Sequence, residues 1–304
     1  MIAEKRDFYL VLIRESGEIV HDIYASTHKD LIQKYLNGGV VRNTYIKATY
    51  SPPKDYNLDE IDNYQLIINQ SYVPEWFAGE LAEKVMEDLK KIIASMIITG
   101  RKPLLLHEGA ILSGNALIDE VKHSVIFGMY DAARIKSLSS SSEIHEMADN
   151  TIVDELHNSS KIFNMYGFAK VKDMFDYSRI MKMYGRTKIG SMHDHARICM
   201  LKGDANIMEM HNMSQADRLK HMSKVDEMHG HSVIEEMWDW TVVEKMFDNS
   251  RINYMDEESR VLEMYGDSMV EEMAGNAIIE ALYENSLVRR LSEKAQILKK
   301  ELGK

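Results

Sequence analysis

Three histidines recur in this sequence at a spacing that could hold a metal ion. His193, His211 and His229 follow one another at steps of 18 residues. Because imidazole is a ligand of zinc and nickel, three histidines on one face of a fold could bind either metal. The alternative is a structural column of stacked rings, since Phe175 and Phe247 occupy the same register. We expect the stacked column, predict no cofactor, and keep the three histidines as candidate binding residues.

Carboxylates gather in the later part of the chain. Residues 226–284 contain sixteen Asp and Glu residues against three Lys and Arg. Such a surface could attract a cationic partner, or could hold the paired carboxylates that polysaccharide-cleaving enzymes use. The alternative is a set of solvated strand faces that prevent aggregation of sheet edges. The acidic residues that we select as candidates for binding are Glu227, Glu235, Glu236, Asp239, Glu244, Glu263, Glu271 and Glu272.

Other reactive chemistry has little support in the sequence. Cys199 is the only cysteine, which excludes an intrachain disulfide and a zinc site built from several cysteines. P-loops, the hydrolase motif GxSxG and the dinucleotide-binding motif GxGxxG do not occur in a supporting context. The chain has 22 methionines, and exposed pairs of them could bind a soft metal such as copper. We expect instead that they fill the interior, because the thioether side chain adapts to irregular spaces.

A nine-residue repeat positions all of these side chains. From Met129 to Leu291 every ninth residue is Met or Leu, over nineteen positions. Three residues earlier lies Ile or Val, with Ala216 the only departure, and five residues earlier lies Ser, Ala or Thr. A helix does not keep one face in register at this step, whereas a short strand followed by a corner does. The repeat therefore predicts a mainly β fold, a parallel β-solenoid whose stacked turns pair their backbones.

The sequence favours two repeats, or about 18 residues, per turn of this solenoid. At steps of 18 residues the residue after Met is aromatic or His, as in the column that contains Phe175 and His193. Glycine also alternates between corners from Gly167 to Gly203. The alternative is three repeats, or about 27 residues, per turn. At two repeats per turn, the nineteen repeats from Met129 to Leu291 predict about nine turns in a rod of about 45 Å, and we expect right-handed coiling.

The segment before the repeat predicts a different structure. Residues 1–100 lack the nine-residue phase and indicate a small α/β cap domain. Thr27 is placed to begin one helix as its N-cap, and Pro74 is placed to begin a longer amphipathic one.

The ends of the solenoid depart from the regular pattern. Residues 101–291 form the predicted solenoid, and its first turns carry a degraded repeat, with Leu117 in phase but Glu120 at the Met position. Residues 292–304 predict a helix with Ser292 as its N-cap. Because an open solenoid end exposes unpaired strand edges, we expect this helix to cap the end or to dimerise across it.

The repeat S/A/T-x-I/V-x-x-M resembles that of a class of bacterial and bacteriophage proteins with tandem S-x-V-x-x-M nonapeptides. Those proteins carry a PEWF-like element, which matches Pro74, Glu75, Trp76 and Phe77. The resemblance covers nearly the whole chain and implies a source but no mechanism. A looser resemblance is to pentapeptide-repeat proteins, acidic right-handed β-helices of which some imitate DNA and bind DNA-handling enzymes. That likeness of shape and charge implies a DNA-mimicking inhibitor.

Bulk properties limit the classes of function. The net charge of −11 and the isoelectric point near 5.6 argue against direct binding to nucleic acid or to anionic membranes. The N-terminal apolar run is too short for a signal peptide, and no stretch is long enough to span a bilayer. The sequence thus predicts a cytoplasmic protein, located in the host cytoplasm if a phage encodes it.

We expect a non-enzymatic protein that binds another protein. The specific hypothesis is a phage- or mobile-element-encoded inhibitor whose rigid acidic surface blocks a host nucleic-acid-handling or defence protein. The first alternative is a structural rod that forms a homodimer through its C-terminal helix or a solenoid end. The second is a polysaccharide-active enzyme or an adhesin, which the uninterrupted repeats disfavour because they leave no long loops to build a cleft.

Overall fold

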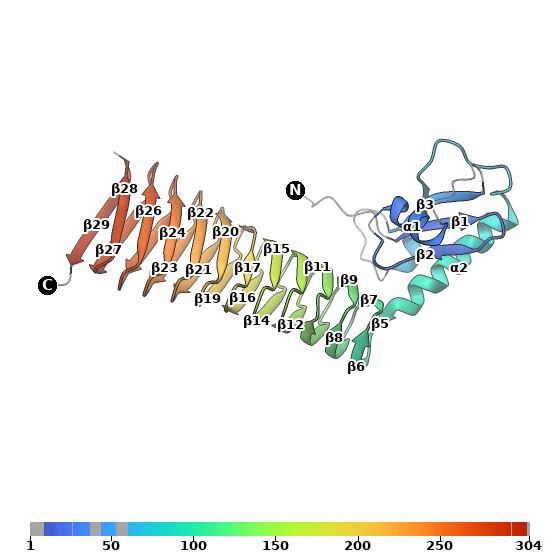
Figure 1. The fold of residues 1–304 in the computed structure, drawn as a ribbon, viewed down its shortest axis with the longest axis horizontal. Helices are drawn as coiled ribbons and strands as arrows, with labels where there is room; N and C mark the ends of the chain where they lie inside the picture. The colour runs from blue at the N-terminus through green and yellow to red at the C-terminus, as the bar shows by residue number, and fades with distance from the viewer. Residues whose placement is uncertain (1–8, 26, 37–43, 53–59, 293, 303–304) are drawn as a thin grey trace. The chain divides into compact units, whose positions relative to one another are not determined.

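The chain divides into two units in the computed structural model (Figure 1). The described residues are 9–25, 27–36, 44–52, 60–292 and 294–302. The first unit comprises Met1–Ile98 and Glu108–Ile111, and the second comprises Thr99–His107 and Leu112–Lys304. All of the candidate binding residues lie in the second unit.

The first unit contains a four-stranded antiparallel sheet of order β2-β1-β3-β4 and two α-helices. Thr27 begins α1 through a capping box: its hydroxyl accepts the backbone N–H of Asp30, and the Asp30 carboxylate accepts the N–H of Thr27. Leu12 of the sheet and Leu31 of the helix belong to one buried core. The elements are β1 (Leu10–Arg14), β2 (Ile19–His21), α1 (His28–Tyr35), β3 (Tyr45–Ser51), a 3₁₀-helix (Ile61–Asn63), β4 (Gln65–Ile68) and α2 (Glu80–Met96).

Helix α2 begins later than the sequence predicts. Pro74 does not start it, because the N–H of Phe77 donates to the carbonyl of Pro74 at 3.0 Å in a separate turn. Gly79 then has a φ of +55°, a left-handed conformation that a continuing α-helix does not contain, so the helix starts at Glu80. Its buried side chains are Val85, Leu89 and Ile93.

Two parallel sheets form the solenoid, which has about eleven turns of 18 residues (Figure 1). Each turn adds one strand to each sheet, and neighbouring strands pair residues 18 apart, such as Ile144 with Ile162 and Met165 with Met183. The prediction of two repeats per turn is confirmed. The turns before Met129, which the sequence predicts as entry turns with a degraded repeat, add to the nine turns predicted for the nineteen repeats, so the total is about eleven.

Sheet 1 has twelve strands: β6 (Arg101–Leu106), β8 (Leu117–Lys122), β10 (Arg134–Ser139), β12 (Ile152–Leu156), β14 (Lys170–Met174), β16 (Lys188–Met192), β19 (Asn206–Met210), β21 (Lys224–Met228), β23 (Val242–Met246), β25 (Arg260–Met264), β27 (Ile278–Glu284) and β29 (Gln296–Leu302). Sheet 2 has thirteen strands, twelve in its order and a short β18 (Leu201–Lys202) that pairs with β15 and β20. The twelve strands of the order are β5 (Ile97–Ile98), β7 (Gly109–Leu112), β9 (Val125–Met129), β11 (Glu143–Met147), β13 (Lys161–Met165), β15 (Arg179–Tyr184), β17 (Arg197–Ile198), β20 (Gln215–Lys220), β22 (Val233–Met237), β24 (Arg251–Met255), β26 (Met269–Met273) and β28 (Leu287–Leu291).

The three repeating residue types fill the interior of the solenoid. In the turn that contains β15, Ser178, Ile180 and Met183 are fully buried, and the same three positions are buried in the turns above and below. Ser178 lies at the corner that precedes β15, whereas Ile180 and Met183 both lie within the strand and both point into the interior. The methionines of the repeat are therefore core residues, as predicted.

The first turns have a register different from the predicted one. In β8 the buried side chains are Ile118 and Val121, whereas the prediction placed Leu117 and Glu120 at these positions. Val121 occupies the Met position of its repeat. The next Met position is Met129, which is eight residues later and not nine. This shorter step shifts the phase by one residue, which reverses the faces of a strand.

The predicted C-terminal helix is wrong. After Leu291 the chain makes a turn, in which the N–H of Ala295 donates to the carbonyl of Ser292 at 3.3 Å, and it continues as β29. This strand pairs in parallel with β27, and Ile297 lies beside Ile279. A short isolated helix is marginal, whereas the strand gains a full ladder of backbone hydrogen bonds, so the helix signals of this segment are overridden.

Candidate functional site

A column of eight stacked rings follows one corner of the solenoid. Each ring directly follows the core Met or Leu at the end of a sheet 1 strand, and it stacks on the ring of the next turn. The ring centroids are 4.7–5.3 Å apart, and the interplanar angles are at most 13°. These contacts confirm the predicted stacked column. Its members are His157, Phe175, His193, His211, His229, Phe247, Tyr265 and Tyr283.

Glutamates fix the edges of two of the candidate histidines. The Glu209 carboxylate lies 2.8 Å from Nε2 of His211, and the Glu227 carboxylate lies 3.0 Å from Nε2 of His229. Neighbouring rings cover the faces of these imidazoles. The structure thus brings His193, His211 and His229 together by ring stacking. Over the part of the chain that the structure describes, no group of three His, Cys, Asp or Glu side chains is placed to hold a metal ion.

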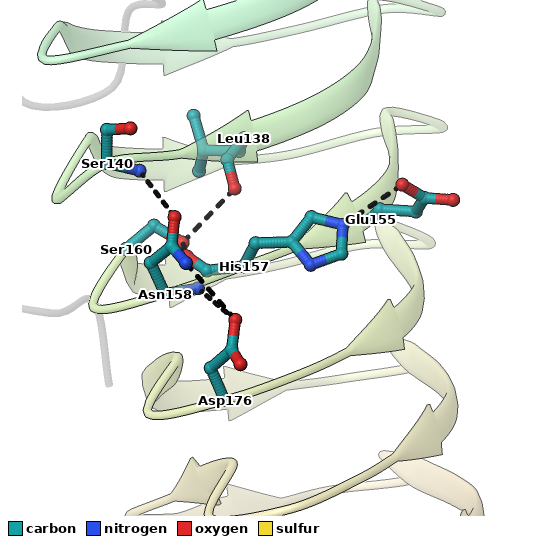
Figure 2. A network of polar contacts seen from close by, with 7 residues as sticks. All are labelled: Leu138, Ser140, Glu155, His157, Asn158, Ser160 and Asp176. Carbon is teal, nitrogen blue, oxygen red and sulfur yellow. Dashed lines mark hydrogen bonds and ion pairs between the residues drawn. The ribbon is translucent and has the colours of Figure 1, made fainter.

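Polar side chains at the corners bind each turn to the preceding one. Figure 2 shows Asn158, whose side-chain oxygen accepts the N–H of Ser140 at 3.3 Å and whose own N–H donates to Asp176 at 2.9 Å. Asn158 has a φ of +58°, a left-handed conformation that Asn and Asp tolerate better than other non-glycine residues. The candidate Asp239 has the same role, because its carboxylate accepts the N–H of His221 at 2.8 Å.

Most of the acidic candidates also contact neighbouring turns. Their partners lie 18 or 20 residues away, on the adjacent strand of the same sheet, so these carboxylates stabilise the rod as well as charging its surface. The contacts are Glu235 with Gln215 and Asn253 (2.6 and 2.5 Å), Glu244 with Lys224 (2.5 Å), Glu271 with Arg251 and Arg289 (2.7 and 3.1 Å) and Glu272 with Arg290 (3.0 Å).

The remaining acidic candidates bind aromatic side chains within their own turn. Glu263 accepts the phenol of Tyr265 at 3.0 Å, and Glu236 accepts the indole N–H of Trp238 at 3.1 Å. Glu244 and Glu263 lie on strands of sheet 1, whereas Glu236 lies on β22 of sheet 2, so they are on different faces of the solenoid. The structure does not bring all eight into one site.

One run of side chains on sheet 2 brings carboxylates and aromatic rings together. The strand register places Tyr254 of β24 between Glu236 of β22 and Glu272 of β26. The ring of Trp238 lies 5.2 Å from the ring of Tyr254, measured between centroids. The hydrogen bond to Asp256 raises the pKa of the Tyr254 phenol to about 12, with further contributions from burial and from the charges of Glu272 and Glu236. All three carboxylates therefore disfavour the charged form of this phenol.

We call this region the acidic aromatic surface. It consists of the outer face of β22, β24 and β26 and the corners that follow β22 and β24. Its acidic and aromatic members are Glu235, Glu236, Trp238, Trp240, Tyr254, Glu258, Glu271 and Glu272, and Arg251 of β24 lies on the same face as the partner of Glu271.

Sequence reasoning missed the aromatic members of this surface. Trp238 and Trp240, two of the three tryptophans, occur together in the segment MWDW, and this clustering was the available signal. Tyr254 stands 18 residues after Glu236 and 18 before Glu272, a register that becomes meaningful once the turn length is known.

The rest of the described chain adds two findings. A pocket of about 420 Å³ lies in the first unit, lined by Arg14, Tyr35, Leu36, Thr44 and Tyr45. None of the candidate residues lines it. Among the described residues, no helix has the length and the apolar character needed to cross a membrane.

Comparison with known proteins gives no match to a family model, to a curated protein or to a solved structure. The resemblance to nonapeptide-repeat proteins therefore stays a prediction. The class that the fold defines is a parallel β-solenoid.

Proposed function

We propose that this chain is a non-enzymatic binding rod whose acidic aromatic surface binds a basic protein. The observation that carries the proposal is the run Glu236, Tyr254 and Glu272 on three neighbouring strands, with Glu235 and Glu271 beside it. Charge complementarity steers two proteins together and selects partners of opposite charge.

Rigidity supports this function. Hydrogen bonds and ion pairs to adjacent turns hold Glu235 and Glu271. Side chains that are ordered before binding lose less conformational entropy when a partner arrives, so a given contact contributes more to affinity. The partner class that we propose is a protein whose basic cleft binds nucleic acid. The rod would occlude this cleft as an inhibitor, encoded by a phage or mobile element as the resemblance to nonapeptide-repeat proteins implies.

Capture of partners from a cell lysate tests the proposal when a neutralised variant is compared with a matched control. The test variant is E235Q/E236Q/E258Q/E272Q, because glutamine keeps the size of glutamate and one acceptor oxygen. At position 236 this oxygen can still accept from Trp238, and at position 235 it can accept from Gln215 or from Asn253, which bind different oxygens of Glu235. Glu271 is left unchanged, since it separates Arg251 from Arg289. The control removes four charges outside the surface, as E120Q/E143Q/E155Q/E209Q.

The expected result is that wild-type and control proteins retain the same basic proteins, identified by mass spectrometry, and that the test variant loses them. Circular dichroism must show the same β content and thermal midpoint for all three proteins. Retention of the same set of proteins by the test variant would overturn the proposal.

The second candidate function is a rod that associates with itself through its last turn. One specific observation favours it: Leu287, Leu291 and Leu298 of β28 and β29 are exposed, on the last strands of both sheets. Strand edges with exposed apolar side chains are prone to pair with another copy. Sedimentation over a range of concentrations tests this candidate. The wild type should associate and L291K/L298K should stay monomeric, whereas a wild type that remains monomeric at high concentration would exclude it.

A further inference from the structure

The corners after β20 and β22, which stack on one another in successive turns, each expose an apolar side chain. Trp240 is 63% exposed and Met222, at the equivalent position one turn earlier, is 61% exposed. Turns of a parallel solenoid are about 4.8 Å apart, so these two side chains are neighbours on the surface. Large exposed aromatic side chains are enriched where proteins bind partners.

A cation already lies over one ring at this corner. Nζ of Lys220 is 5.7 Å from the ring centroid of Trp238, within the range of a cation–π contact. The same indole packs against Tyr254 and donates to Glu236. The corner thus combines the two features that attract a cationic side chain, aromatic faces and nearby carboxylates.

Carboxylates surround the rings on more than one side. Glu236 and Glu272 flank Tyr254 in the strand register, and the Tyr254 phenol donates to Asp256 at 2.6 Å. Glu258 is exposed one turn after Trp240 in the same corner column. A neutral apolar partner would have to desolvate these charges, which is costly, whereas a cation would not leave them unpaired.

We propose that Trp238, Trp240 and Tyr254 form a subsite for an arginine side chain of the basic partner. The inference rests on the proposed function and names the chemical group that the surface selects. Arginine fits better than lysine, because its planar guanidinium stacks on indole and phenol faces while its N–H groups reach carboxylates in pairs.

Two synthetic probes test this subsite without knowledge of the partner. They are N-acetylated, C-amidated octa-arginine and octa-lysine, which carry equal charge but differ in the ability to stack. The dissociation constants of both are measured with the full chain by calorimetry. The variant is W240A, and the matched control is F168A, because Phe168 occupies the same corner column and is 48% exposed but lies under Arg186 instead of among carboxylates.

The wild type should bind octa-arginine more tightly than octa-lysine. W240A should weaken octa-arginine binding about two- to fivefold, the value of one exposed cation–π contact, and should weaken octa-lysine binding less, because an ammonium contacts the indole without stacking on it. F168A should change neither constant. Equal affinity of the wild type for the two probes, or unchanged octa-arginine binding by W240A, would overturn the subsite.

The four-glutamine variant separates failure of the subsite from failure of the proposed function. If W240A binds octa-arginine like the wild type but E235Q/E236Q/E258Q/E272Q weakens both probes, the subsite is wrong and the acidic surface stands. If neither variant changes either constant, both proposals are wrong.

Discussion

The imidazole of His193 lies flat on the imidazole of His211, with ring centroids 4.9 Å apart and 5° between the planes. This contact belongs to a column in which Phe and Tyr alternate freely with His, so the shared property of its members is a flat ring. The residues that first suggest a metal site thus act as packing on the outside of a corner.

Two replacements of His211 should show whether its contribution to stability comes from ring stacking or from the polar imidazole nitrogens. H211A removes stacking contacts with His193 and His229, and each aromatic pair contributes about 0.5–1.5 kcal/mol, so the free energy of unfolding should fall by about 1–3 kcal/mol. H211F keeps both contacts and should lose much less. Urea unfolding measures the difference, and equal losses in the two variants would show that stacking is not the role of this column.

Methionines of the interior and of the surface should respond differently to truncation. Met183 is fully buried, so M183A should lower the free energy of unfolding by about 2–5 kcal/mol through lost packing and a cavity. Met213 is exposed, so M213A should change it by less than about 0.5 kcal/mol. Thermal unfolding of the two variants checks this. Similar midpoints would contradict the assignment of the repeat methionine to the core.

Asp176 should be needed for its side-chain oxygen. D176A leaves the N–H of Asn158 without its 2.9 Å acceptor at an exposed corner and should cost about 0.5–1.5 kcal/mol of stability. D176N retains an oxygen and tolerates the left-handed backbone at this position, where φ is +58°. It should therefore stay close to the wild type in urea unfolding. If D176N is as unstable as D176A, the charge and not the hydrogen bond is required.

Asp154 should make stability depend on pH. It lies 2.7 Å from Arg134 and 2.8 Å from Lys172. Burial alone would raise its pKa, but hydrogen bonds and charges from these two cations outweigh burial and hold the pKa below the ordinary 3.8. A depressed folded pKa gives stability that is present above the unfolded value and is lost as pH falls through the folded value.

D154N removes this contribution, so it should be less stable than the wild type at pH 7 and lose less stability between about pH 5 and pH 2. Urea unfolding across this range measures it. D204N is the control, since Asp204 is exposed and lies 3.7 Å from a single arginine. Parallel pH profiles for D154N and the wild type would contradict the role of the ion pairs.

The period of the sequence predicts the solenoid well, because every inward position is constrained by the same narrow interior. Met183 and Ile180 lie inward for a reason that acts equally in each turn. A local change of the repeat length is not predicted by the period. At Val121 the repeat is one residue shorter, so the buried positions of β8 differ from the predicted ones by one residue. At Ser292 a local helix signal competes with strand pairing, and only the neighbouring strand decides the outcome.

The candidate surface is less predictable, because function does not repeat with the period. The sequence places Glu271 in an acidic segment. Its ion pairs with Arg251 and Arg289 can be identified only from the stacking of adjacent turns. Trp240 occupies a corner position at which other turns have many different residue types, so the repeat does not predict a binding role for it. The proposed role comes from the exposure of its side chain and from neighbouring residues of other turns.

The claim that the acidic aromatic surface binds a basic protein is tested most directly by the dissociation constant of the complex with a basic protein captured from lysate. It is measured for the wild type, for E235Q/E236Q/E258Q/E272Q and for E120Q/E143Q/E155Q/E209Q at about 0.05 M and about 0.5 M salt. We predict that salt weakens the wild-type and control complexes strongly, and that the first variant binds about tenfold more weakly at low salt, with a smaller salt effect. The same constant for all three proteins at both salt concentrations would contradict the claim.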